Sequence, residues 1–398
     1  MPVSLNTDNL TFIDFPQQIA LQKYEQNIQE FVKYFRTHPT VSAIYQIGGI
    51  NDPGISDLDL VLVLKENEAL SSKDNDFLTT LNQYLFIHPP FIISEDLFVY
   101  LPYFFYANNI RKLTGKNYQF LEPELSLDNL QLCALLCYEA AIGRLSDIIY
   151  QTTCGNSISL RKMLLKLNSI KHNISLMNKV IDTCEGNGWD KFIIQIGSLR
   201  RSWFSLSKDE QIKNTYSALY EGVNVLLEII NNLALRSKNL FRIDNICNEH
   251  PEAYYIYPNS LQIIKYNGDS KSSISTVRNP FFFLKKLRFK AQKKIARHVN
   301  DLSIITLPKE LILLLLLIGT KDNLFVRNQK YFSCVSKHNV PAVIKLRVDL
   351  LNKYNEFISA HKDLHMSYLT MGSSLEKKAK FYTIKKCLLK SLIKYQVV

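Results

Sequence analysis

Two carboxylates at strand spacing are the residues of this sequence best suited to chemistry. Asp57 and Asp59 open the apolar run DLDLVLVL, a short turn after the pair Gly48 and Gly49. Side chains two positions apart in a strand point to one face, so the two carboxylates should project together. Adjacent carboxylates repel each other unless a cation lies between them, and Mg²⁺ prefers such oxygen ligands. The pair therefore predicts a divalent-metal site.

The glycines that precede the pair favour a phosphate nearby. Gly48 and Gly49 carry no side chain, so backbone N–H groups there can approach an anion closely. A divalent ion next to a phosphate can activate an attacking hydroxyl and stabilise the leaving oxygen. The stretch therefore indicates phosphoryl or nucleotidyl transfer.

The segments around the carboxylates predict a small α/β unit that ends near residue 120. Apolar periodicity predicts helices at 18–36 and 74–85, and strands at 41–47, 58–64 and 91–101. The strand at 58–64 is apolar on both faces, which is typical of a strand inside a covered sheet.

The chain of 398 residues is too long for one compact core, and its composition changes twice. Residues 121–240 keep an apolar stripe and predict a helical domain. Residues 241–398 are basic and combine a hairpin pattern near 252–268 with helical segments. The expected fold class is α+β, with a mixed-sheet core at 1–120 followed by a helical domain and a mixed C-terminal region.

The order strand, Gly-Gly, short turn, Asp-x-Asp and apolar strand resembles the nucleotidyltransferase superfamily of the polymerase-beta type. Members of that family move a nucleoside monophosphate from a nucleoside triphosphate to an acceptor hydroxyl, with two Mg²⁺ ions on three carboxylates. The resemblance covers roughly the first 120 residues. It assigns the first two carboxylates to Asp57 and Asp59, and the third to Asp96 with Glu95 as the alternative.

The same resemblance implies the remaining contacts. The backbone at Gly48 and Gly49, together with Ser56 and Lys171, is expected to bind the triphosphate, with Mg²⁺ as cofactor and Mn²⁺ as the alternative ion. The chain departs from the family where Gly49 replaces the commoner Ser, and its turn before Asp57 is shorter.

The acceptor is not identified by the sequence, because a small molecule, a sugar, a protein hydroxyl and an RNA end all fit a basic cleft. A non-polymer acceptor is favoured over nucleic acid, since no recognisable RNA-binding module accompanies the core. A catalytically degenerate protein that binds a nucleotide, RNA or a partner is the alternative.

Bulk composition adds a few general expectations. A net charge of +12 favours anionic partners, and the basic segment 281–298 fits RNA, an anionic membrane or a solvated helix face equally well. Seven cysteines without paired spacing predict reduced thiols and a cytoplasmic protein. The longest apolar run, 310–319, is too short to span a bilayer, so no transmembrane segment is expected.

Overall fold

The computed structural model describes residues 11–107, 109–123, 126–153, 157–181, 189–241, 252–256, 263–267, 275–277, 342–361 and 363–367. Within these residues the fold is α+β with mixed strand orientation, as the sequence predicts. The basic segment 281–298 and the apolar run 310–319 lie outside the described residues.

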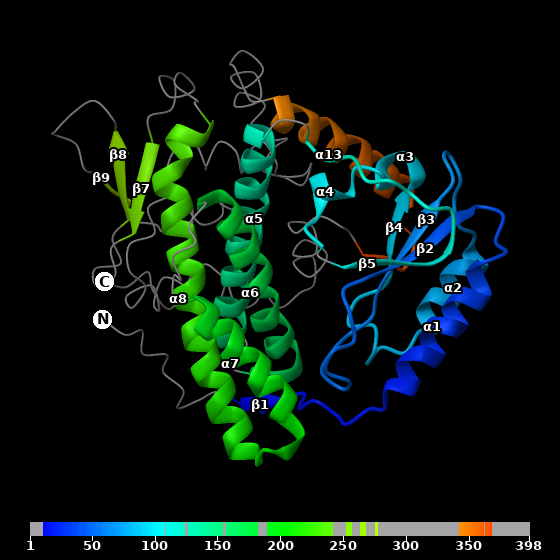
Figure 1. The fold of residues 1–398 in the computed structure, drawn as a ribbon, viewed down its shortest axis with the longest axis horizontal. Coiled ribbons are helices and arrows are strands. Elements are labelled where there is room, and N and C mark those ends of the chain that lie inside the picture. Colours follow the sequence, from blue (N-terminus) through cyan, green and yellow to red (C-terminus); the bar gives the residue numbers. More distant parts are fainter. Residues whose placement is uncertain are drawn as a thin grey trace.

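A four-stranded sheet carries Asp59 as the first residue of one strand, and Asp57 lies just before that strand. Figure 1 shows the sheet beside the long helices. Its strands lie in the order β4 (Phe91–Ser94), β3 (Asp59–Leu64), β2 (Val41–Ile47) and β5 (Ile110–Gly115). β3 runs parallel to β4 and antiparallel to β2, which is in turn antiparallel to β5. The strands predicted at 41–47 and 58–64 are therefore confirmed, whereas β5 was not expected from the sequence.

Alternating residues of the sheet enter two separate cores, as the period of a strand requires. One face packs against α1 (Leu21–Phe35) and α2 (Ser72–Thr80), and its buried strand residues are Ile44, Leu60, Leu62, Leu64 and Ile92. The opposite face joins the core of the helical region through Ala43, Tyr45, Ile47, Val61, Val63, Phe91 and Ile93. This double burial explains why 58–64 is apolar at nearly every position.

The two helices on the outer face follow the predicted pattern with different lengths. α1 buries Tyr24, Ile28, Phe31 and Phe35 on one side. α2 begins at a capping box in which Ser71 and Asp74 satisfy each other's backbone N–H groups. It ends at Thr80, earlier than the predicted residue 85, because Leu81 adopts an extended backbone.

The strand predicted at 91–101 is wrong beyond Ser94. The chain turns there into two short helices, α3 (Glu95–Phe98) and α4 (Leu101–Phe104). Two carboxylates in the first turn of α3 complement the positive end of the helix dipole, which favours a helix start at this point.

The predicted helical region is confirmed. It consists of α5 (Ser126–Thr153), α6 (Leu160–Ile181), α7 (Trp189–Ser202) and α8 (Lys208–Phe241), with the short 3₁₀ helix η1 (Trp203–Ser205). The strand β6 (Ser157–Ser159) pairs in parallel with β1 (Thr11–Ile13), so a segment near the N-terminus lies against the helices. None of the described helices combines the length and apolar composition needed to cross a membrane.

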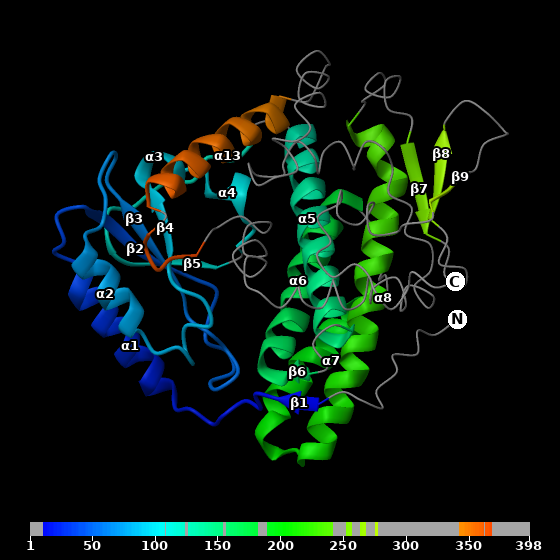
Figure 2. The same cartoon turned by 180° about the vertical axis from the view of Figure 1, so that it is seen from behind.

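The described elements of the C-terminal region lie in two separate places. The predicted hairpin is present as β7 (Glu252–Ile256) and β8 (Ile263–Asn267), with β9 (Ser275–Val277) added to it. The helix α13 (Ala342–Ala360) instead contacts α4, α5 and β4 (Figures 1 and 2). The buried Arg347 of α13 donates from Nε to the carbonyl oxygen of Tyr103 at 2.7 Å. A late segment of the chain thus completes the core of the sheet.

Candidate functional site

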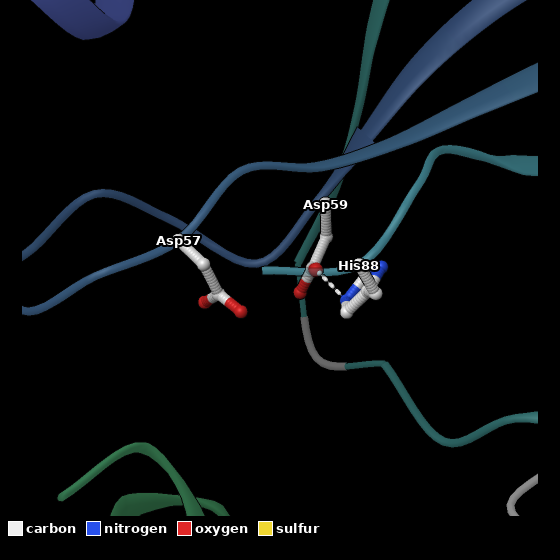
Figure 3. A group of neighbouring side chains, drawn as sticks. All are labelled: Asp57, Asp59 and His88. Carbon is white, nitrogen blue, oxygen red and sulfur yellow. Dashed lines mark ion pairs between the residues drawn. The ribbon is translucent and has the colours of Figure 1, made fainter. Parts of the chain in front are cut away.

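Three side chains with metal-ligating atoms meet where β3 begins. One ligand atom each of Asp57, Asp59 and His88 lies within 4.8 Å of the other two. His88 Nε2 is 2.7 Å from Asp59 Oδ1, and Asp57 lies beside this pair (Figure 3). All three residues are partly exposed, so the group is open to solvent. Asp57 and Asp59 therefore lie together, as the sequence predicts.

The electrostatics of the group are those of two carboxylates sharing one cation. Burial and the charge of Asp59 raise the pKa of Asp57 to about 6. Burial alone would lower the pKa of His88, but the charges of Asp59 and Asp57, with hydrogen bonds to Asp59 and Pro89, together outweigh it and raise this pKa to about 9. At neutral pH the imidazole therefore carries a positive charge that partly offsets the two carboxylates.

One carboxylate oxygen of the group depends on a single partner. Asp59 Oδ1 is buried as an atom, and its partner is the charged His88 imidazole, with Nε2 2.7 Å away. A buried carboxylate needs such a compensating cation, and a bound metal ion would serve the same purpose.

His88 was not expected at the site from the sequence. It precedes β4, and the parallel register pairs Val61 with Phe91, so the residues just before β4 lie next to Asp59. The only available sequence signal was a ligand-type residue shortly before a strand that runs parallel to the Asp-bearing strand. Recognising it requires the register.

Asp96 and Glu95 lie at the other end of the sheet. Leu64, the last residue of β3, pairs with Ser94, which places the start of α3 about 16 Å along the strand from Asp59 at roughly 3.3 Å per residue. Glu95 accepts hydrogen bonds there from Tyr118, Ser42 and Lys116. The third carboxylate suggested by the family resemblance is thus not brought to the site by either residue.

The two glycines next to the site differ in what surrounds them. Gly48 has φ +74°, and its N–H already donates to the carbonyl oxygen of Asn109 at 2.8 Å. A Cβ added to Gly49 would meet its nearest neighbour, Asn51 Oδ1, at 3.5 Å. The pair therefore leaves open space for a ligand, but the Gly48 N–H is engaged within the protein.

Ser56, expected to bind the nucleotide, instead fixes the loop before Asp57. It is buried, and its hydroxyl accepts from the backbone N–H of Asp52 at 3.2 Å and from Arg200 at 3.3 Å. Its carbonyl oxygen accepts from Tyr24 and from Arg161, both at 2.8 Å. Ser56 thus connects the loop to the helical region.

Lys171, also expected to bind the nucleotide, lies on α6. Its ammonium group donates to Asn168 Oδ1 at 3.4 Å. Burial lowers the pKa of Lys171, the charge of Arg200 lowers it further, and the charge of Asp52 raises it. The structure therefore brings Lys171 close to Arg200 and Asp52, within the electrostatic range of the loop that carries Asp57.

Two arginines of the helical region complete this arrangement, and sequence reasoning missed both. Arg161 contacts the loop through the carbonyl oxygens of Ile55 and Ser56. Arg200 pairs with Asp52, with 2.6 Å between Nε and Oδ2.

Comparison of the chain with models of known protein families, with curated proteins and with solved structures finds no match, so its function has to be argued from this site.

Proposed function

We propose that the protein is a divalent-metal-dependent nucleotidyltransferase. It moves a nucleoside monophosphate from a nucleoside triphosphate to a hydroxyl of a non-polymer acceptor, with Mg²⁺ or Mn²⁺ as cofactor. The observation that supports this proposal most directly is the meeting of Asp57 and Asp59 with a third metal-ligating side chain next to Gly48 and Gly49.

Each part of the site has a role in this reaction. Asp57 and Asp59 hold the ion, and Gly49 leaves space for the phosphates next to it. The bound ion would polarise the phosphate and lower the pKa of the attacking hydroxyl. Lys171, within electrostatic range of Asp52, would add a positive charge that favours a polyanionic ligand, although burial lowers its pKa.

A catalytically degenerate binding module is the second candidate, and one observation favours it. His88 pairs with Asp59, so a positive charge already offsets one carboxylate without any metal, and Asp96 is remote. Such a module would bind a nucleotide or a partner without turnover, and it would not need both carboxylates.

Metal-dependent binding of nucleoside triphosphates tests the proposal. Each of the four triphosphates is titrated, with and without divalent metal, into the wild type, Asp57→Asn, Asp59→Asn and the exposed control Asp76→Asn. We expect binding in the wild type and in the control, and a loss of at least tenfold in affinity in the two site variants, because each loses a ligand charge. Equal binding by folded site variants would refute the metal site.

Turnover separates the enzyme from the binding module. Pyrophosphate release is followed with the preferred triphosphate after addition of a small-molecule extract as the source of acceptors. The nucleotidyltransferase releases pyrophosphate, and Asp57→Asn lowers the rate by orders of magnitude, whereas a binding module releases none. If the acceptor is an RNA, the affinity of the protein for it should fall steeply as the salt concentration rises.

A further inference from the structure

The orientation of His88 is fixed from two sides. Its Nδ1 lies 3.0 Å from the carbonyl oxygen of Pro89, which makes Nδ1 the donor of that hydrogen bond. Its ring packs against Phe91, with 4.8 Å between the ring centroids. The remaining nitrogen, Nε2, therefore faces the two carboxylates (Figure 3).

This arrangement is the one that metal-ligating histidines adopt. Such a histidine usually donates its other ring N–H to a backbone carbonyl or a carboxylate, which sets the tautomer and aims the free nitrogen at the ion. At His88 the backbone carbonyl is that of Pro89. Nε2 lies 2.7 Å from Asp59 Oδ1, so an ion bound here would replace the proton that the two atoms share.

We propose that Asp57, Asp59 and His88 form one three-residue metal site that prefers a first-row transition ion, Mn²⁺ in the test below, over Mg²⁺. Mg²⁺ takes oxygen ligands almost exclusively, whereas imidazole nitrogen is a good ligand for transition ions. One nitrogen in place of a third carboxylate also lowers the negative charge of the ligand set, which weakens its attraction for Mg²⁺. This inference rests on the proposed function, because it concerns the same ion.

The test is direct binding of Mn²⁺ to the full chain. Binding is measured as the loss of the electron paramagnetic resonance signal of free Mn²⁺, and Mg²⁺ is then added as competitor. The wild type alone answers the selectivity question. We expect Mg²⁺ to displace Mn²⁺ only in large excess, of the order of a hundredfold or more. Displacement at equal concentrations would overturn the inference without any variant.

Variants then test the ligand itself. His88→Ala should weaken Mn²⁺ binding at least tenfold, and His88→Asp should bind Mg²⁺ more tightly than the wild type does. The control is His38→Ala, because His38 Nε2 forms a comparable ion pair with Asp74 Oδ1 at 3.1 Å, away from the site. The control should bind Mn²⁺ as the wild type does.

The outcomes separate this inference from the proposed function. Wild-type Mn²⁺ affinity in folded His88→Ala, with binding lost in Asp57→Asn, would show that His88 is an ion-pair partner only and would leave the nucleotidyltransferase proposal intact. Unchanged binding in Asp57→Asn and Asp59→Asn as well would remove both. Thermal melting of each variant without metal verifies that it is folded.

Discussion

The guanidinium group of Arg161 donates to the carbonyl oxygen of Ser56 at 2.8 Å, so helix α6 holds the residue immediately before Asp57. The same side chain donates to the carbonyl oxygens of Ile55, at 3.2 Å, and of Tyr84, and it lies over the Tyr84 ring. A single buried cation thus joins the loop of the site to the segment that leads to His88.

Replacement of Arg161 by Met should therefore destabilise the fold and disorder the site together. Buried carbonyl groups would lose their donors, at about 1–3 kcal/mol for each group left unsatisfied. The free energy of unfolding, measured in urea, should fall by several kcal/mol in total, and metal binding should weaken. The neighbouring exposed Lys162, changed to Met, is the matched control and should alter neither quantity. Metal binding unchanged in Arg161→Met would show that the hydrogen bonds of Arg161 do not position Asp57.

The ion pair between Arg200 and Asp52 provides the second prediction. The pair is 2.6 Å long, with only 3% and 15% of the two side chains exposed. Removal of one partner leaves a buried charge alone and costs about 3–5 kcal/mol. Arg200→Met should lower the free energy of unfolding by that amount, and the exposed Arg201→Met should not.

A double variant shows whether this effect is due to the pair itself. When both Arg200 and Asp52 are replaced by apolar residues, no unpaired charge remains. The double variant should then lose less stability than the sum of the two single variants. Additive losses would mean that each residue acts independently.

Two glycines near the site should respond differently to the same change. Both have positive φ, +74° at Gly48 and +89° at Gly54, but a Cβ at Gly54 would lie 2.1 Å from the Gln17 carbonyl oxygen, whereas one at Gly48 meets nothing within 4 Å. Gly48→Ala should cost only the backbone strain, about 1–2 kcal/mol. Gly54→Ala should cost clearly more, because the backbone must move. Comparison of the two melting temperatures checks this, and equal losses would contradict it.

The hydrogen bonds of Glu95 should make the free energy of unfolding depend on pH in the acidic range. The hydrogen bond from Tyr118, with those from Lys116 and Ser42, lowers the pKa of Glu95 below its ordinary 4.5, although burial opposes this. A carboxyl group whose pKa is lowered by folding stabilises the fold at every pH above its ordinary pKa. This contribution is lost as the pH falls from about 4.5 through the lower pKa that the group has in the folded protein.

The measurement is urea unfolding of wild type and Glu95→Gln at several pH values. The stability difference between them should be largest above pH 4.5 and should shrink in more acidic solution. The exposed Glu66→Gln serves as the control for a change of net charge and should follow the wild-type curve. A difference that is constant with pH would show that the charge of Glu95 does not stabilise the fold.

The sequence predicted those parts of the fold whose residues obey a local period. β2, β3 and α1 were found because burial on one or both sides leaves a repeating apolar pattern. The segment 91–101 failed because its aromatic and branched residues are typical of a strand throughout. Its Ser-Glu-Asp sequence, which is typical of a helix start, was the signal that the apolar pattern obscured.

The site was predictable only in its local half. Asp57 and Asp59 are two positions apart, so their short separation along the chain keeps them close, although Asp57 lies before β3 and not in it. The place of His88 depends on the register of β3 with β4, and those of Arg161 and Arg200 depend on how the helices pack. Neither relation leaves a periodic pattern. Asp96 was assigned because the resemblance expects the third carboxylate on a later strand after a helix, but that strand ends at Ser94.

The attachment of α13 to β4 has a consequence for synthesis on the ribosome. Tyr354 donates to the carbonyl oxygen of Ile92 at 3.3 Å, and the backbone N–H of Ser367 donates to that of Pro90 at 2.9 Å. At about 5–20 residues per second, these partners emerge on the order of ten to fifty seconds after β4 itself. Throughout that interval the nascent chain carries an uncovered apolar sheet edge, so chaperone binding during translation should matter more for this protein than for one whose sheet is completed by neighbouring segments.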